Sequence, residues 1–263
     1  HTGDLSKYKC VIAPMLQNFD NPEIEKFIEY VNAGGNLYID GASDERLIKR
    51  LLGGENEGFN GTSMTYIAPK AGCEKTLSDF NAKYPMPFKY KLAAVSCAED
   101  CEILATLSLP GTVPEDNLHF VSIHSNPPWE VTEIPAIIRR KVGKGCVTWC
   151  AAAIEKDERA AFGNAFLSLI DDMTGGDYAV SAKASKNVET ITFKAKNAFY
   201  VSAVSLSADA LCEYPVEITV KTEALPVSVK ELICGKEIPF AFDNGKVTFK
   251  DTVKLHSSYE IKL

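Results

Sequence analysis

Histidine and tryptophan are scarce in this sequence, which has four and two of them among 263 residues. No apolar run approaches the roughly 20 residues of a membrane-spanning helix, so no membrane span is expected. Basic residues are in deficit as well, because 28 Lys and Arg face 35 Asp and Glu, for a formal net charge of −7. An acidic surface repels phosphate, which argues against nucleic acid and anionic membranes as partners.

The cysteines lack the spacing of a zinc site. Two pairs, Cys97–Cys101 and Cys146–Cys150, are C-x3-C rather than C-x2-C. Several cysteines lie within apolar runs, where a free thiol behaves as a small hydrophobic group; these are Cys10, Cys146, Cys150 and Cys234. We therefore expect reduced, buried thiols, no metal and a reducing, cytoplasmic location. The composition leaves one disulfide open.

Neither a nucleotide motif nor a signal peptide is visible. The "GKG" at 143–145 lacks the remainder of a phosphate loop, and the glycines at 34, 35 and 41 do not form G-x-G-x-x-G. We expect no cofactor. The first residues, "HTGDLSKYK", are polar and do not begin with methionine. They do not resemble a secretory signal, and we expect the chain to be a piece of a longer protein.

The first part of the chain predicts strands that alternate with helices. The continuous apolar run "YKCVIAPML" (8–16) is typical of a strand buried on both faces of a parallel sheet, and "NLYID" (36–40) predicts the next strand. Between them, 21–35 has an apolar helical stripe, with Asn21 as its N-cap and Gly34–Gly35 as its stop. This order is typical of a βαβ unit with a right-handed crossover.

The following segments extend this pattern into an α/β domain over residues 1–178. A second helix is expected at 43–53, and residues 54–90, rich in Gly, Asn, Lys and Pro, are expected to form an irregular insertion. The further elements are strands at 101–109 and 118–125, a hairpin of strands 136–141 and 146–152, and a helix at 157–173. The element order predicts a class I amidotransferase-like, flavodoxin-like layered domain.

The residue pattern of the sequence changes at about residue 179. Short β-branched segments alternate with turn residues at intervals of roughly ten, and "DNGK" (243–246) contains the Asn-Gly signal of a hairpin. These features predict a small antiparallel β-sandwich over residues 179–263. The charge supports the division, because ten Lys balance ten Asp and Glu from Ser185 onward and the net charge lies in the first part.

A nucleophile elbow would be expected in the turn after the second strand. Here "GASDE" (41–45) lacks the second glycine of G-x-S-x-G and has no cysteine. We interpret Ser43 as the N-cap of the next helix. An independent hydrolase that uses Asp40, Ser43 or His124 stays an alternative.

Paired carboxylates are the catalysts of most glycosidases, and the sequence has three local pairs. These are Asp40 with Asp44, Glu99 with Asp100, and Asp171 with Asp172. Sequence neighbours of this kind are usually solvated, so we assign no catalytic role. Asp40 lies at the end of a predicted strand, where ligand crevices form in such sheets, and it is kept as a ligand-binding candidate.

The segment "IHSNPPWEV" (123–131) combines one histidine and one tryptophan around two prolines. His124 has no visible catalytic partner, and the prolines make the path stiff and extended. We interpret the segment as a rigid connector. A ligand-binding role for His124 and Trp129 remains the alternative, with Trp129 or Tyr66 as a stacking platform for a sugar.

Four segments of the sequence resemble those of a known family. "EIEKFIEYVNAGGNLYIDG", "HSNPPW", "IPAIIRRKVGKGCVTWCAA" and the closing "GKVTFKDTVKLHSSYEIKL" together resemble the C-terminal half of certain glycoside hydrolases. The first part is similar to the trimerisation domain of family-42 β-galactosidases, which also accompanies barrels related to family-29 α-L-fucosidases. The resemblance extends over nearly the whole chain, but the 54–90 segment matches nothing in that pattern.

The resemblance implies an accessory region without catalytic residues of its own. In such enzymes the two catalytic carboxylates belong to an upstream (β/α)8 barrel, which is not part of this sequence. The implied partners are that barrel and other copies of the chain in a homo-oligomer. A carbohydrate-binding module is the alternative function, with His124, Trp129 and Asp40 as its candidate ligand residues.

Overall fold

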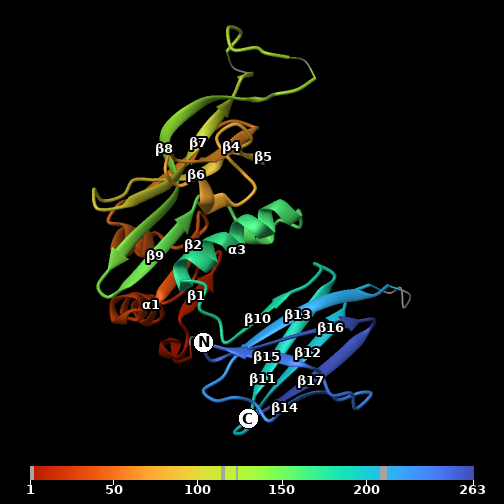
Figure 1. Cartoon of the computed structure of the whole chain (residues 1–263). Coiled ribbons are helices and arrows are strands. Elements are labelled where there is room, and N and C mark those ends of the chain that lie inside the picture. The colour runs from red at the N-terminus through yellow and green to blue at the C-terminus, as the bar shows by residue number, and fades with distance from the viewer. Residues whose placement is uncertain (1–2, 114–115, 123, 208–211) are drawn as a thin grey trace. The chain divides into compact units, whose positions relative to one another are not determined.

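A computed structural model of the chain describes residues 3–113, 116–122, 124–207 and 212–263. The chain divides into two compact units, His1–Gly176 and Asp177–Leu263 (Figure 1), here called unit 1 and unit 2. The boundary predicted after residue 178 falls close to this division. That each part folds on its own stays a prediction.

Unit 1 is a β-rich α/β fold built on a mixed sheet. Among the described residues the sheet has seven strands, of which β1, β2 and β9 are parallel and the others antiparallel. In spatial order the strands are β1 (Cys10–Ala13), β2 (Asn36–Asp40), β9 (Gly145–Cys150), β8 (Pro128–Val142), β7 (Glu102–Pro110), β4 (Thr65–Pro69) and β5 (Met86–Phe88). A separate antiparallel pair consists of β3 (Asn56–Asn60) and β6 (Leu92–Val95).

The helical segments of unit 1 are short apart from two. They are η1 (Leu5–Lys7), α1 (Asn21–Ala33), α2 (Glu45–Leu47), η2 (Ile48–Leu52), η3 (Glu74–Leu77), η4 (Ile154–Lys156) and α3 (Ala160–Thr174). The predicted β1–α1–β2 unit is confirmed, with β1 and β2 as parallel neighbours. The N-cap of α1 is Asp20 rather than the predicted Asn21, because the Asp20 carboxylate accepts from the backbone N–H of Glu23 at 2.9 Å.

Strand β2 is covered on both faces. Tyr38 points to the opposite face from Leu37 and Ile39, and all three side chains are fully buried. The Tyr38 ring meets Phe166 of α3 edge to face, with centroids 5.2 Å apart. The strand predicted at "NLYID" is therefore confirmed, and it is buried on both faces.

Strand β1 differs from its prediction. The apolar run predicted burial on both faces, but in the described sheet β1 pairs with β2 alone and the Ile12 side chain is 45% exposed. Apolar character along a short run reports burial of a strand in general. It cannot tell an edge position from a central one.

The segment 54–90 is also not the predicted insertion. It contains β3, β4, η3 and β5, and β4 lies within the main sheet between β7 and β5. All five residues of β4 are buried. Polar, glycine-rich connections surround these short strands. The composition of the whole segment therefore predicted an irregular insertion instead of strands.

The strand predicted at 118–125 is absent from the described residues of that range. The backbone N–H of Val121 donates to the hydroxyl of Thr112, and the side chain of Asn126 exchanges hydrogen bonds with the backbone of Thr112. These side chains replace a strand ladder. Residue 123 lies outside the described residues.

The predicted helix 43–53 begins one residue later than expected. Its N-cap is Asp44, whose carboxylate accepts from the backbone N–H of Arg46, whereas Ser43 lies outside the helix. The helix continues as a wider π-helical turn over Ile48–Leu52 and ends at Gly53, which has a φ of 71°. Only a residue that tolerates left-handed backbone suits this stop.

Unit 2 has two four-stranded antiparallel sheets that share one hydrophobic core. Phe249 and Tyr259, from different sheets, have ring centroids 5.1 Å apart. The hairpin predicted at "DNGK" is confirmed, with Asn244 and Gly245 in left-handed conformations. The strands are β10 (Val180–Lys183), β13 (Tyr214–Lys221), β16 (Lys246–Val253) and β15 (Phe240–Asp243) in one sheet, and β11 (Val188–Lys194), β12 (Ala198–Ser205), β17 (His256–Lys262) and β14 (Ser228–Glu231) in the other.

All eight cysteines lie in the described part of the chain and are free thiols. Of the four thiols predicted to be buried, only Cys150 is, and burial raises the pKa of its thiol to about 12; Cys10 and Cys146 are half-buried. Cys234 is exposed, contrary to the prediction, and its sulfur donates to Glu231 at 2.8 Å. None of the helices in the described ranges is long and apolar enough to cross a membrane.

The two tryptophans provide a matched test of this fold. Trp149 in β9 is fully buried, whereas the Trp129 side chain is 70% exposed. We expect Trp149→Ala to lower the free energy of unfolding of unit 1 by about 3–5 kcal/mol, because it removes a large core side chain and leaves a cavity. Trp129→Ala should change it by less than about 0.5 kcal/mol. Urea unfolding at low protein concentration measures both changes in free energy. Equal effects would contradict the difference in burial between Trp149 and Trp129.

Candidate functional site

A cavity of about 710 Å³ opens where the parallel strands β1, β2 and β9 end. Its walls are the loop after β1, the turn after β2, parts of β3 and β6, and the segment after β9. The carboxyl ends of parallel strands are the usual place for a ligand crevice in a sheet of this kind. Of the predicted ligand residues, Asp40 lies in this wall.

The side chain of Asp40 connects two segments of the cavity wall by hydrogen bonds. Its Oδ1 accepts hydrogen bonds from the backbone N–H groups of Met15 and Ala42, at 3.0 and 3.1 Å. The hydroxyl of Ser43 lies 3.4 Å from the same oxygen. The residue is 1% exposed, and its Oδ2 has no partner in the described part of the chain.

The loop after β1 has a strained backbone. Met15 and Asn18 both have positive φ, at 52° and 62°, which is unusual for residues other than glycine. Both residues line the cavity. Conformations of this kind persist where the surroundings hold them, and here the hydrogen bond from Met15 to Asp40 does so.

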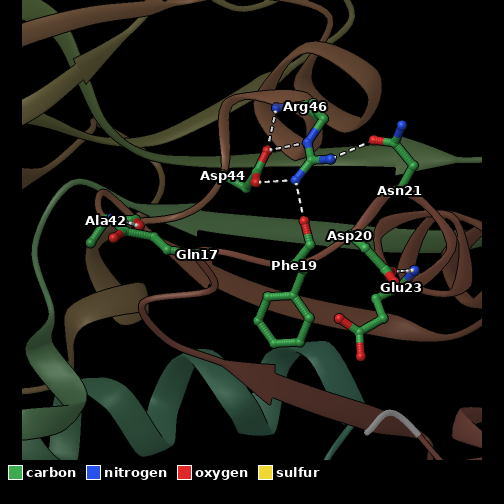
Figure 2. Close-up of polar contacts among 8 residues, drawn as sticks. All are labelled: Gln17, Phe19, Asp20, Asn21, Glu23, Ala42, Asp44 and Arg46. Carbon is green, nitrogen blue, oxygen red and sulfur yellow. Dashed lines mark hydrogen bonds and ion pairs between the residues drawn. The ribbon is translucent and has the colours of Figure 1, made fainter.

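A second contact holds the same loop through Arg46 (Figure 2). Its guanidinium donates from Nε and Nη2 to the two oxygens of Asp44, at 2.9 and 2.6 Å. It also reaches the carbonyl of Phe19 and the side-chain oxygen of Asn21, at 2.6 and 2.5 Å. These hydrogen bonds connect the start of α2 to the loop before α1 and hold the pKa of Asp44 below its usual value.

The same clamp occurs a second time in unit 1. "DER" is found at 44–46 and at 157–159. In the second copy Asp157 accepts from Nε and Nη2 of Arg159 at 2.8 and 2.6 Å. The repeated tripeptide was the visible signal of both clamps, and sequence reasoning missed it.

A half-buried acid, Glu155, follows strand β9. Tyr38 donates its hydroxyl to Oε2 of Glu155 at 3.1 Å. Burial raises the pKa of the Glu155 carboxyl, and it raises the pKa of Tyr38 well above its usual value. Asp40 and Cys150 lie close enough to affect the pKa of Tyr38.

Ser43 is neither a helix cap nor an exposed nucleophile. It is 7% exposed, and its hydroxyl accepts from the backbone N–H of Asp40 at 3.2 Å. His124 does not line the cavity and lies in the connection between β7 and β8. The structure therefore brings Asp40 and Ser43 together but does not bring His124 to them.

His124, Trp129 and Tyr66 belong to a different part of unit 1. His124 is exposed in the connection, Trp129 is exposed at the start of β8, and the hydroxyl of Tyr66 donates to the carbonyl of Asn126. Tyr66 is buried at 7% exposure, so its ring is not available as a platform. Within the described ranges, no three His, Cys, Asp or Glu side chains gather where they could bind a metal ion.

No protein-family model and no curated protein matches the chain. Solved structures do match it. Alpha-L-fucosidase isoenzyme 2 from Paenibacillus thiaminolyticus aligns with a TM-score of 0.74 and 16% identity over 99% of this chain and 41% of that chain. Gan42B, a GH42 beta-galactosidase from G. stearothermophilus, aligns with 0.65 and 15% over 99% and 33%. The beta-galactosidase from Bacillus circulans sp. alkalophilus gives 0.64 and 17% over 98% and 34%.

These likenesses show a shared fold. The chain has the fold of a region of these glycoside hydrolases, and it spans 41% of the fucosidase and about a third of the two galactosidases. Both units are included in the match, because it extends over nearly the whole chain.

The Arg46 clamp gives a prediction about the pKa of Asp44. We expect Arg46→Gln to raise this pKa towards the ordinary value of about 3.9, because the side-chain hydrogen bonds from Arg46 are the main cause of its lowering. A lowered pKa stabilises the fold above the unfolded value, and that stabilisation is lost as the pH falls through the folded value. Carboxyl ¹³C chemical shifts measured against pH report this directly.

The second clamp supplies the control for this measurement. Arg159→Gln should raise the pKa of Asp157 in the same way and leave that of Asp44 unchanged. An unchanged Asp44 titration in Arg46→Gln would refute the assignment.

Proposed function

We propose that this chain is a non-catalytic, C-terminal accessory region of a glycoside hydrolase of the β-galactosidase or α-L-fucosidase type. In this role it supports an upstream catalytic barrel and mediates self-association. The main support is the alignment of 99% of the chain with part of a fucosidase and part of a galactosidase. The chain spans less than half of either protein, which leaves room for a catalytic domain elsewhere in a longer polypeptide.

The finer assignments follow from the same proposal. Unit 1 is an amidotransferase-like layer related to the trimerisation domain, and unit 2 is a β-sandwich. The parallel β1–α1–β2 unit supports the first assignment, and the two sheets around one core support the second. A cytoplasmic location is proposed from the eight free thiols.

The connection between β7 and β8 supports a role in association. It leads away from the rest of unit 1 (Figure 1) and, together with the start of β8, we call it the apolar arm. The arm consists of the described residues of 111–131, and its exposed apolar side chains are Leu118, Phe120, Val121, Trp129 and Val131. Leu118 is 92% exposed. Apolar side chains that gather on a surface usually mark a contact with another protein.

The alternative of an independent hydrolase has less support. It needs a base close to Ser43 or an acid–base pair with room for substrate. The neighbour of the Ser43 hydroxyl is Asp40, whose Oδ1 also accepts two backbone hydrogen bonds. His124 lies on the apolar arm rather than beside this pair.

Hydrolysis and sedimentation together test the accessory role. We expect the 263-residue chain to sediment as an oligomer and to release no chromophore from nitrophenyl fucosides or galactosides, because the proposal places both catalytic carboxylates in the barrel. Turnover that disappears in Ser43→Ala or His124→Ala would instead support the independent hydrolase. A chain that stays monomeric over the whole concentration range would reject self-association.

The apolar arm gives a sharper prediction about assembly. The double variant Leu118→Ser, Phe120→Ser should weaken self-association by at least about tenfold, because loss of two large apolar contacts costs more than about 1.4 kcal/mol. Phe193→Ser is the matched control, since Phe193 is 63% exposed but lies in unit 2. Sedimentation equilibrium measures both, and an equal response of the two variants would exclude the arm as the interface.

A further inference from the structure

Two cysteines of unit 1 form a pair at a tight turn between β6 and β7. The backbone N–H of Cys101 donates to the carbonyl of Ala98 at 3.0 Å and closes the turn. Cys97 directly precedes the turn, and its side chain is hydrogen-bonded to that of Cys101. Both are half-buried free thiols that pack against the core of unit 1. The fold therefore holds two reduced sulfur atoms next to each other at a partly exposed place.

The same spacing occurs a second time with a different geometry. Cys146 and Cys150 are also separated by three residues, but both lie along the extended strand β9. A strand rises about 3.3 Å per residue, so their Cα atoms are about 13 Å apart, whereas a disulfide requires Cα atoms closer than about 7 Å. Cys150 is also fully buried. The turn, rather than the spacing in sequence, therefore distinguishes the pair that can form a bond.

Contacts with the end of η2 and with β8 hold this turn in place. The carbonyl of Leu52 accepts from the backbone N–H of Ala98 at 2.9 Å and from the thiol of Cys101 at 3.5 Å. The guanidinium of Arg140 in β8 donates to the side chain of Asp100 at 2.8 Å and to a backbone carbonyl of η2 at 3.2 Å. The two sulfur atoms are thus kept close together without a disulfide.

The surroundings of Cys101 decide which thiol reacts first. Burial, and after it the neighbouring Cys97, raises the pKa of the Cys101 thiol to about 12. Only a thiolate attacks a disulfide, so Cys101 keeps its proton at neutral pH and Cys97 is the attacking group. Once Cys97 is bonded to another sulfur it carries no charge, and one cause of the raised pKa of Cys101 is removed. The guanidinium of Arg140, which lowers that pKa, remains.

We propose that Cys97 and Cys101 form a reversible redox pair that is oxidised by low-molecular-weight disulfides such as oxidised glutathione. The Cys97 thiolate attacks one sulfur of the reagent and breaks its S–S bond, and the released glutathione thiolate takes up the proton that Cys97 lost. The Cys101 thiolate then attacks Sγ of Cys97, breaks the mixed disulfide and releases the second glutathione, which takes up the proton of Cys101. Two protein thiols are oxidised to one disulfide, and one reagent disulfide is reduced to two thiols.

Oxidation changes the contact between the turn and η2. Sγ of Cys101 has no proton in the disulfide, so its hydrogen bond to the carbonyl of Leu52 is lost. The backbone N–H of Ala98 still donates to the same oxygen, so this carbonyl keeps a partner in both redox states. In a reducing compartment the pair stays a dithiol until the oxidised fraction of glutathione rises. The proposal concerns unit 1 alone and does not depend on the accessory role.

Redox titration of the folded 263-residue chain tests the proposal. The chain is equilibrated in glutathione buffers of increasing oxidised fraction, free thiols are blocked with N-ethylmaleimide, and the peptides are identified by mass spectrometry. We expect a disulfide between Cys97 and Cys101 as the main bond within the chain, and we expect it to disappear when reduced glutathione is added back. Cys146 and Cys150 are the matched control and should form no bond with each other, because β9 holds them apart.

Two single variants test the order of the steps. Cys101→Ser should stop at a mixed disulfide between Cys97 and one glutathione, because the second attacking thiol is missing. In Cys97→Ser, Cys101 should react with oxidised glutathione at least about tenfold more slowly than Cys97 does in Cys101→Ser, because its raised pKa leaves little thiolate. Serine is close to cysteine in size and keeps a hydrogen-bond donor at each position.

Several results would overturn the proposal. One is the lack of a bond between Cys97 and Cys101 at every buffer ratio, and another is a bond between Cys146 and Cys150 that forms equally readily. Equal rates of mixed-disulfide formation in the two variants would refute the assignment of Cys97 as the attacking thiol. The titration of the unsubstituted chain decides whether the pair forms a disulfide, even where a variant does not fold.

Discussion

The carboxylate of Asp40 is the interaction on which the site depends. One of its oxygens accepts from the turn after β2 and from the loop after β1, where the donor lies 25 residues before Asp40 in sequence. Its burial makes these hydrogen bonds strong and makes the unpartnered oxygen costly. The left-handed backbone of Met15 persists because this carboxylate holds its N–H. The cavity therefore keeps its shape through one buried charge and through Arg46 on the rim.

The cavity is formed by two groups of elements of unit 1. The parallel strands β1, β2 and β9 bring their carboxyl ends to one edge, which forms the floor. Strand β3 and the segment leading into β6 supply Phe59 and Tyr90. The apolar arm belongs to the antiparallel half of the sheet and has no part in the cavity. The arm proposed for association and the cavity are thus separate surfaces of one unit.

Local sequence signals predicted the elements whose causes are local. The apolar stripe and Gly34 define α1, the Asn-Gly turn defines the β15–β16 hairpin, and "NLYID" defines strand β2. The predictions that were wrong share another cause, which is pairing between distant segments. Strand β4 is only five residues long, and its partner β7 lies about forty residues further along the chain. No pattern within β4 itself reveals that pairing, because the hydrogen bonds and burial that make it a strand come from elsewhere.

By itself the sequence determined the succession of α/β and all-β parts and the position of Asp40 at a strand end. Tertiary structure alone decided what surrounds that residue. It turned Ser43 inward to Asp40, capped α2 with Asp44, separated His124 from both, and brought Phe59, Tyr90 and Lys91 to the same cavity. The physical reason is that helix and strand periodicity arise from neighbours along the chain. A binding site arises from side chains that meet only after the sheet has formed.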